Sequence, residues 1–284
     1  MTIRPAARAT TPAETEQTSW RNTIIVGDAS HLLRVLPRAV GPVPLILFSP
    51  PYNLGTTTGG GFPGKGGAAG KWGGGALSEG YDGTDDAMPQ PVYMAWLADV
   101  LDAAWQALSD DGAIYMNHKP RILGGVLLSA LDYVPAHLRR YVRQEIVWAR
   151  AGGVNFSASF YVPTSERIVV IARPAWRLKS KGASGAGDVW TISQQAGTWH
   201  PAPFPLALAE RVLETTGAAL VIDPFMGSGT TGRAARRLGV PWIGFERSAR
   251  YAAQAMRDIE NTMPYSSATR DLFDQMDGLL ETTP

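Results

Sequence analysis

The sequence contains no cysteine among its 284 residues. This excludes disulfide bonds, zinc sites built from thiolates and every mechanism that needs a cysteine nucleophile. No run of about 18 apolar residues occurs, so the sequence predicts no membrane-spanning helix. Residues 1–19 are rich in Thr, Ala and Pro and lack the apolar segment of a signal peptide, which predicts a disordered tail and a cytoplasmic protein.

The sequence also has almost no excess of charge of one sign, because the net charge is only +1. The distribution is uneven, however. Between His137 and Lys181 the only acids are Glu145 and Glu166, while the basic residues there are Arg139, Arg140, Arg143, Arg150, Arg167, Arg173, Arg177, Lys179 and Lys181. Such a patch suits a polyanion such as nucleic acid, although a solvated surface that is basic by chance has the same composition.

Short apolar runs alternate with segments of helical periodicity along most of the chain. The runs predict strands at Thr23–Val26, Val43–Phe48, Gly112–Asn117, Glu145–Trp148, Arg167–Ala172, Ala219–Ile222 and Trp242–Phe245. The periodic segments predict helices at Met94–Leu108, Phe204–Thr215, Thr230–Leu238 and Arg250–Thr262, with the Asp-Asp-Gly after the first one ending it. This alternation predicts an α/β fold whose mixed, mostly parallel sheet carries helices on both faces, with one hairpin between the fourth and fifth strands.

Two segments stand outside this alternation. Residues 53–90 are centred on the glycine-rich stretch Thr56–Gly75, which cannot pack a core and predicts a mobile loop. Residues 174–199 are basic, rich in Gly and Ser, and include two tryptophans. We therefore expect one domain over residues 20–262, with these two segments as its loop and insertion, between tails at 1–19 and 263–284.

A glycine-rich turn lies between a predicted buried strand and a predicted helix, over Asp223–Thr231 (DPFMGSGTT). In an open α/β sheet, ligands bind beyond the carboxyl ends of the strands, and glycines let the backbone approach them closely. Glu246 ends the next strand, where a carboxylate can accept both hydroxyls of a ribose. Together these features predict a nucleoside cofactor, either a dinucleotide or S-adenosylmethionine; a tight structural turn with a surface glutamate is the alternative.

A second motif, Ser49-Pro50-Pro51-Tyr52, directly follows the apolar run Val43–Phe48. The two prolines impose a rigid exit from the strand and remove competing backbone donors. A hydroxyl, a fixed carbonyl and an aromatic ring side by side suit a flat heterocycle with an amino group, with Tyr52 stacking on its ring. A proline turn with a packed tyrosine is the alternative for such a motif on its own.

With these two motifs in this order, the sequence resembles the amino-methyltransferases of DNA, in the arrangement called the beta class. Gly27-Asp28 near the start and the run His200–Pro205 before the cofactor strand match further family landmarks, so the resemblance extends from about Ile24 to Thr262. It implies a circularly permuted, Rossmann-like methyltransferase fold, with the domain 20–262 as the catalytic domain. It also implies S-adenosylmethionine as cofactor and no metal.

The resemblance implies roles for individual positions. The methionine part of the cofactor would be held, largely through backbone, by Asp223, Phe225, Gly227, Ser228, Gly229 and Thr230. Glu246 would take the ribose hydroxyls, Asp28 would lie near the adenine, and Pro203 and Phe204 would help to wall the methionine end. The family often has Lys where this chain has Pro203, so a charged contact is lost there while a backbone role remains.

The reaction that follows is methyl transfer to an exocyclic amino nitrogen. That nitrogen is a poor nucleophile because its lone pair is delocalised into the ring. Hydrogen bonds from both amino protons to Ser49 Oγ and the Pro50 carbonyl localise the lone pair, and attack is then a direct displacement. Methylation of cytosine at carbon 5 needs a thiolate and is excluded. The target base must be flipped out of the duplex. Ser49 at the first position favours N4 of cytosine, with N6 of adenine as the alternative.

Recognition of double-stranded DNA is expected from three groups of basic residues. Lys65 and Lys71 of the glycine-rich loop would contact phosphates, and Arg177, Lys179 and Lys181 lie in the segment 174–199, where the family places its target-reading insertion. Arg139, Arg140 and Arg143 are expected to contact phosphates. The insertion is short, so a homodimer would share the reading, and a cognate restriction endonuclease is a further expected partner.

Other readings of the sequence are weaker. Gly59–Lys65 has the spacing of a phosphate-binding loop, but Gly66 follows where Ser or Thr is needed. A nicotinamide-dependent oxidoreductase would also use a glycine turn with a distant acid, but Arg233 stands where a small third residue is expected. A non-catalytic DNA-binding relative would not need both motifs intact. An RNA substrate stays open.

Overall fold

The computed structural model describes residues 20–53, 87–150, 152, 158–179, 181–194, 199–200 and 203–266. The predictions for the tail 1–19, for nearly all of the loop 53–90 and for residues 267–284 therefore lie outside the described residues. Within the described ranges no helix is both long and apolar enough to cross a membrane.

The described part of the chain is built on an eight-stranded sheet with the order β1-β10-β9-β2-β3-β7-β6-β8. Its strands, in that order, are Thr23–Val26, Trp242–Glu246, Val221–Asp223, Val43–Phe48, Leu108–His118, Ser165–Ala172, Val142–Ala149 and Val189–Thr191. Only β7 runs against its neighbours, and the other neighbouring pairs are parallel. The predicted α/β fold with a mixed, mostly parallel sheet is confirmed, as is the hairpin of β6 and β7.

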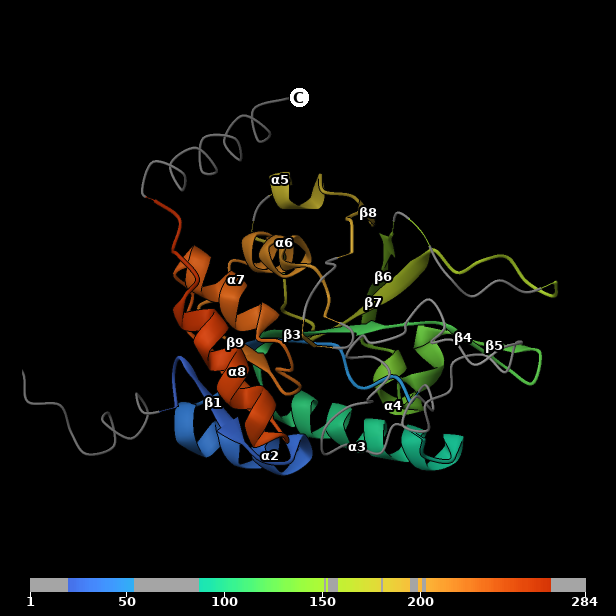
Figure 1. Ribbon diagram of the computed structural model, residues 1–284, viewed down its shortest axis with the longest axis horizontal. Coiled ribbons are helices and arrows are strands. Elements are labelled where there is room, and N and C mark those ends of the chain that lie inside the picture. The colour runs from blue at the N-terminus through green and yellow to red at the C-terminus, as the bar shows by residue number, and fades with distance from the viewer. Residues whose placement is uncertain are drawn as a thin grey trace, which may run out of the picture.

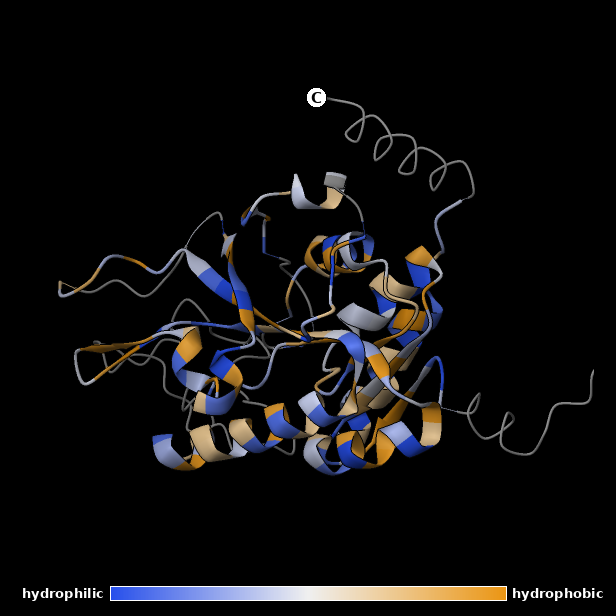
Figure 2. Ribbon diagram, turned by 180° about the vertical axis from the view of Figure 1, so that it is seen from behind, coloured by the Kyte–Doolittle hydropathy of each residue, from blue (hydrophilic) through white to orange (hydrophobic). Residues whose placement is uncertain are grey.

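Helices cover both faces of the sheet (Figure 1). One face carries α2 (Ala29–Val40), α3 (Gln90–Ala107), η3 (Ala130–Tyr133) and α4 (Ala136–Arg139), and the other carries α6 (Leu206–Thr216), α7 (Thr230–Leu238) and α8 (Ala249–Glu260). Smaller elements are α5 (Lys181–Ser184) and the hairpin of β4 (Arg121–Leu123) and β5 (Val126–Leu128). The helices mix hydrophilic and hydrophobic residues along their length (Figure 2), as expected where one side of each is buried.

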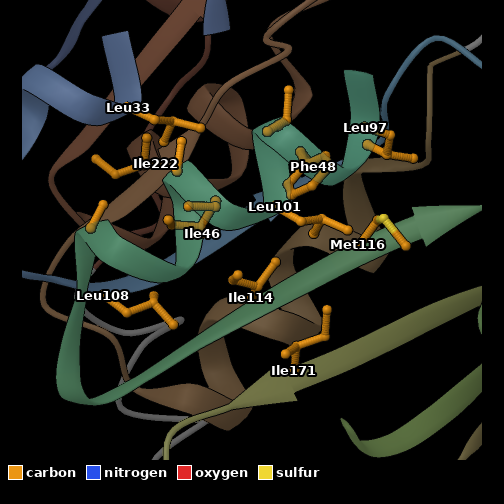
Figure 3. Close-up of a cluster of buried hydrophobic side chains, with 14 of the residues drawn as sticks. Leu33, Ile46, Phe48, Leu97, Leu101, Leu108, Ile114, Met116, Ile171 and Ile222 are labelled. Atoms are coloured by element: carbon orange, nitrogen blue, oxygen red, sulfur yellow. The ribbon is translucent and has the colours of Figure 1, made fainter. Parts of the chain in front are cut away.

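The core explains the continuous apolar sequence of β2. Ile46 and Phe48 pack on the side of α2 and α3, whereas Leu45 and Leu47 pack on the side of α6 and α7. Successive side chains of a strand point to opposite faces, so a strand covered on both sides needs apolar residues throughout. Figure 3 shows the first of these two clusters, where Leu33 of α2 and Leu97 and Leu101 of α3 lie against Ile46 and Phe48.

The prediction that Asp-Asp-Gly separates a helix from a strand was wrong. Helix α3 ends at Ala107, and β3 begins at once with Leu108 and includes the polar residues before Ala113. Leu108 pairs with Val43, and the register then shifts before Leu45 pairs with Ala113. The polar segment is accommodated as an irregularity in the pairing, at the end of the sheet away from the site described below.

Two further elements were not predicted. Helix α2 begins after Asp28, whose side chain caps it, and buries Leu32, Leu33 and Leu36. Part of the segment 174–199 forms β8, which pairs with β6 at the edge of the sheet and buries Trp190. This part of the expected insertion is therefore an extension of the main sheet.

Candidate functional site

A cavity of about 800 Å³, open solvent included, lies at the edge of the sheet where β1, β2, β9 and β10 end. Its described lining residues come from the loops after these four strands and from the helices beside them: Gly27, Asp28, Ala29, Ser49, Pro50, Pro51, Tyr52, Met88, Trp96, His200, Pro224, Phe225, Gly227, Glu246, Arg247 and Tyr251. The two sequence motifs, far apart in the chain, thus face one cavity. This is the edge at which open α/β sheets bind ligands.

Glu246, at the end of β10, is held by two backbone amides. Gly227 N donates to its Oε2 at 2.9 Å, and Ser248 N donates to its Oε1 at 2.9 Å. Each carboxylate oxygen has more than one acceptor site. The side chain is therefore fixed at the cavity wall and can still accept hydroxyl protons from a ligand.

Asp28 caps helix α2 beside the same wall. Its Oδ1 accepts hydrogen bonds from Ser30 N at 3.0 Å, Ser30 Oγ at 2.8 Å and His31 N at 3.2 Å. Burial alone would raise the pKa of Asp28, but these hydrogen bonds and the nearby Arg247 outweigh it, and the pKa lies below its usual value. The cavity therefore keeps a negative charge at this end.

Gly227 has a positive φ of 48°, and a Cβ built on it would lie 2.8 Å from Nε2 of His200. A side chain at this position would displace the imidazole and would also be strained by the positive φ, so glycine is favoured here. His200 also contacts the rings of Trp199 and Tyr251. Burial lowers the pKa of His200 to about 4, so the imidazole is neutral near pH 7.

Asp223 shapes the glycine-rich turn but does not line the cavity. It is 1% exposed; its Oδ1 accepts from Phe225 N at 2.9 Å and its Oδ2 from Thr231 Oγ1 at 2.6 Å. Burial raises the pKa of Asp223 to about 7, against the effect of these two hydrogen bonds. Its position indicates that it holds the turn in shape for Phe225 and Gly227, which do line the cavity.

Several residues expected to bind the cofactor lie behind the cavity surface. Ser228 and Thr230 are buried, with their hydroxyl oxygens 2.9 Å apart, and Gly229 is the N-cap of α7. Phe204 packs in the core with residues of α6. Neither Phe204 nor Pro203 is among the described residues that line the cavity. The structure thus brings Asp28, Phe225, Gly227 and Glu246 to the cavity, and not the residues Pro203, Phe204, Asp223, Ser228, Gly229 and Thr230.

Hydrogen bonds from neighbouring segments fix the backbone of the Ser-Pro-Pro-Tyr motif. Tyr93 of α3 donates its hydroxyl proton towards the Pro51 carbonyl at 2.7 Å. Asn53, which has a positive φ of 56°, exchanges two hydrogen bonds with the backbone of Met88 at 2.7 and 2.8 Å. None of the described residues donates a hydrogen bond to the Pro50 carbonyl, which is therefore open to a donor from a ligand.

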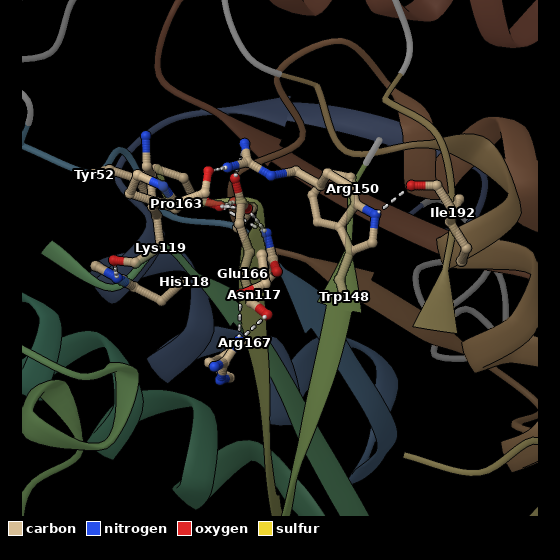
Figure 4. Close-up of polar contacts among 12 residues, drawn as sticks. Tyr52, Asn117, His118, Lys119, Trp148, Arg150, Pro163, Glu166, Arg167 and Ile192 are labelled. Carbon is tan, nitrogen blue, oxygen red and sulfur yellow. Dashed lines mark hydrogen bonds and ion pairs between the residues drawn. The ribbon is translucent and has the colours of Figure 1, made fainter. Parts of the chain in front are cut away.

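The hydroxyl of Tyr52 enters a buried polar cluster (Figure 4). It lies 2.7 Å from Ser49 Oγ, 2.9 Å from Glu166 Oε2 and 2.7 Å from Asn117 Nδ2. Arg150 pairs with Glu166 at 3.1 Å, and both side chains are 7% exposed. Asn117 and Glu166 were not predicted as site residues; the available signal is that each is a polar residue at the end of an apolar strand segment.

Three cations lie beside this cluster. Burial lowers the pKa of Lys119, and the positive charges of Arg150 and Arg121 lower it further, while Glu166 acts in the opposite direction. Arg121 also donates to the backbone oxygen of Tyr52 at 3.3 Å. With three cations around one carboxylate, the region next to Tyr52 is positively charged.

The basic residues expected to bind DNA lie elsewhere. Arg143 donates a hydrogen bond to the Arg173 carbonyl, and Arg173 N donates to the Gly112 carbonyl near the start of β3. Lys179 N donates to the Thr215 carbonyl, near the end of α6. Arg140 stacks over Tyr141, which lies against Trp105 near the end of α3. These contacts place Arg140, Arg143 and Lys179 towards the edge where the parallel strands begin, opposite Ser49, and Arg177 lies between Arg173 and Lys179 with its side chain on the Pro174 and Trp176 carbonyls.

These residues lie away from the cavity at Ser49, towards the far end of β3, and their contact with DNA phosphates stays a prediction. Arg139, at the end of α4, donates to the Val134 carbonyl at 3.0 Å. Lys65, Lys71 and the side chain of Lys181 lie outside the described residues, as does the stretch Gly59–Lys65.

The sequence matches the DNA methylase family over residues 43–257. The DNA adenine methyltransferase YhdJ of Escherichia coli K12 is 22% identical over 282 residues, covering 86% of this chain and 85% of that protein. The Type II methyltransferase M.ScaI of Streptomyces caespitosus is 25% identical over 271 residues, covering 82% and 80%.

Two solved structures share the fold. The PvuII DNA methyltransferase (cytosine-N4-specific) superposes with a TM-score of 0.59 at 18% identity, covering 90% of this chain and 92% of that one. The M1.HpyAVI–SAM complex gives a TM-score of 0.55 at 19% identity, covering 84% and 99%. Because the family match covers most of the sequence, the chain belongs to the DNA methylase family.

Proposed function

We propose that this protein transfers a methyl group from S-adenosylmethionine to the N4 amino group of a cytosine flipped out of DNA, with the motif order of the beta class. The observation that carries the proposal is the shared cavity, which is lined by Ser49 and Pro50 together with Gly227 of the glycine-rich turn and Glu246 at the end of β10. The part of the cavity at Gly227 and Glu246 suits a nucleoside cofactor, and the part at Ser49 and Pro50 suits a base with an amino group.

The residues present fit the cofactor. Glu246 is positioned to accept the ribose hydroxyls, and Phe225 and Trp96, whose rings are 5.5 Å apart, give the wall an apolar surface. Asp28 lies near the adenine in this assignment. When bound, S-adenosylmethionine supplies a methyl group on a positively charged sulfur. The protein named in a solved complex with SAM shares this fold, which supports the assignment.

The residues of the motif activate the target. Ser49 Oγ and the Pro50 carbonyl accept the two amino protons, which localises the nitrogen lone pair and aims it at the methyl group. The ring of Tyr52, which is buried at the cavity, stacks on the base. The absence of cysteine excludes attack at carbon 5, so an exocyclic nitrogen is the target.

The choice of cytosine rests on Ser49, and on the shared fold of a methyltransferase named as cytosine-N4-specific. Adenine N6 is the alternative, because the similar protein YhdJ is named as an adenine methyltransferase. The nicotinamide reading is set aside because the family match covers both motifs. A restriction endonuclease partner is supported by the Type II name of M.ScaI, and a homodimer stays a prediction.

At the flipped base we assign the DNA contacts to Lys119 and Arg121, because Arg140, Arg143 and Lys179 lie towards the opposite edge of the sheet. Both lie at the end of β3 beside Tyr52, where the phosphates that flank a flipped base would pass. Cations at such positions fix the register of the duplex on the protein and carry no base specificity.

Product identification tests the proposal. The protein is incubated with S-adenosylmethionine and unmethylated genomic DNA, the DNA is digested to nucleosides, and the products are identified by mass spectrometry. N4-methylcytosine is the expected product. N6-methyladenine would overturn the assignment of cytosine, and the absence of any methylated nucleoside, with bound cofactor, would overturn DNA as the substrate.

A further inference from the structure

The hydroxyl of Ser49 lies at the end of a buried chain of hydrogen bonds that begins at an ion pair. Arg150 donates to Glu166 Oε1 at 3.1 Å and to the Pro163 carbonyl at 2.9 Å. A guanidinium only donates, and a carboxylate paired with it only accepts. The partners of Glu166 Oε2 must therefore be donors.

Asn117 provides one of these donors. Its Nδ2 lies 2.8 Å from Glu166 Oε2 and 2.7 Å from the Tyr52 hydroxyl oxygen. Turning the amide over would place its oxygen against the carboxylate, so Glu166 fixes the orientation of the amide. Asn117 Oδ1 has no hydrogen-bond partner in the described part of the chain. The orientation seen leaves this one acceptor unpaired, which costs less than directing the amide oxygen at the Glu166 carboxylate.

The direction of the next two bonds follows. Tyr52 has one hydroxyl proton, and Glu166 Oε2, 2.9 Å away, can only accept it. The Tyr52 oxygen already accepts from Asn117 and has no proton left for Ser49. Ser49 Oγ, 2.7 Å from that oxygen, must therefore donate its own proton to Tyr52.

We infer that Glu166, Asn117 and the Tyr52 hydroxyl act as positioning residues that fix Ser49 as a hydrogen-bond acceptor towards the target base. With its proton directed to Tyr52, Ser49 Oγ presents only lone pairs to the cavity. An unconstrained serine hydroxyl can donate as well as accept, and would also bind a keto oxygen such as that of thymine. The fixed direction favours an amino group over a keto group at the same position. This inference rests on the proposed function for its consequence, but the direction of the chain stands independently of it.

A double-mutant cycle tests the consequence. Tyr52→Phe keeps the ring and removes the hydroxyl, and is expected to slow single-turnover methylation by about tenfold to a hundredfold, with cofactor and DNA affinities unchanged. If the hydroxyl acts through Ser49, the same substitution in a Ser49→Ala background should change the rate by no more than about twofold. A merely structural role would give the full loss in both backgrounds, and that result would overturn the inference.

Matched variants separate this effect from general damage. Tyr115→Phe makes the same change at a buried tyrosine of β3 that is not among the cavity-lining residues, and should leave the rate unchanged. Glu166→Gln leaves one acceptor oxygen, which Arg150 requires, and puts an NH2 donor towards Tyr52; it should therefore lower the rate as Tyr52→Phe does. Glu210→Gln breaks another Arg–Glu pair, between Glu210 and Arg237, which has the same N–O distance of 3.1 Å. This variant should leave the rate unchanged. Equal losses from the two Glu→Gln variants would contradict the inference.

Neutron diffraction from the deuterium-exchanged protein tests the direction itself, without any reaction. A deuteron on Tyr52 directed to Glu166, and one on Ser49 directed to Tyr52, are the expected result. A Ser49 deuteron directed into the cavity would overturn the inference even if the protein methylates DNA. A missing methylation product with the expected deuterons would instead overturn the proposed function.

Discussion

Replacing Glu246 by glutamine tests the cofactor site with almost no change of shape. Its two oxygens accept from Gly227 N and Ser248 N, and both partners are donors. A glutamine amide would place an NH2 group against one of them, leaving that donor unpaired at a cost of about 1–3 kcal/mol. The ribose would also lose a charged acceptor, worth about 1.5–3 kcal/mol, which corresponds to about tenfold to a hundredfold weaker binding of S-adenosylmethionine.

Calorimetric titration with S-adenosylmethionine measures this loss, and denaturant unfolding measures the cost to the free protein. Glu260→Gln, at an exposed position near the end of α8, is the matched control and should bind the cofactor as the unmodified protein does. If Glu246→Gln binds with unchanged affinity, the assignment of Glu246 to the ribose hydroxyls is refuted.

Three further predictions follow from the site. Gly227→Ala should abolish cofactor binding, since its Cβ would lie 2.8 Å from the His200 imidazole, and a thermal shift assay that still shows stabilisation by S-adenosylmethionine would contradict this. Lys119→Gln should weaken DNA binding and reduce its salt dependence by about one released counterion, whereas Arg143→Gln should change neither in a titration at several salt concentrations. Burial lowers the pKa of His118 to about 3 and that of His200 to about 4. As the pH falls from about 6.5, these two histidines take up protons in the unfolded chain only, whereas Asp223, with its pKa raised to about 7, takes up one proton in the folded protein and offsets part of the effect. The free energy of unfolding should therefore decrease towards about pH 4, and in denaturant titrations a His118→Gln variant should lose less over this window.

The sequence was informative where the structure is regular. Strand β2 was predicted with its observed bounds because both of its faces are buried, and α7 because it follows a glycine turn and ends at Gly239. Each of the two motifs was placed after a strand from the sequence, and they line a common cavity because the carboxyl ends of parallel strands share one edge.

Long-range packing explains what the sequence did not show. Arg143 and Lys179 belong to the same basic stretch as Arg150, but β6 begins and antiparallel β7 ends at the edge opposite Ser49. Arg143 near the start of β6 and Lys179 after β7 therefore lie towards that edge, whereas Arg150 follows the end of β6. Glu166 belongs to the site only because β7 runs antiparallel to β3 and begins where β3 ends, two residues along β7 from Ile168, which pairs with Asn117. Periodicity along the chain gives the direction of neither strand, so these placements need the fold.

The central claim is methyl transfer at Ser49, and a labelled-methyl assay tests it most directly. Unmodified protein and Ser49→Ala are compared with deuterated-methyl S-adenosylmethionine and unmethylated DNA, and cofactor binding is measured in parallel. We expect label on the DNA with the unmodified protein, and a rate lower by about a hundredfold or more with Ser49→Ala at equal cofactor affinity. Equal rates for the two proteins would contradict the account.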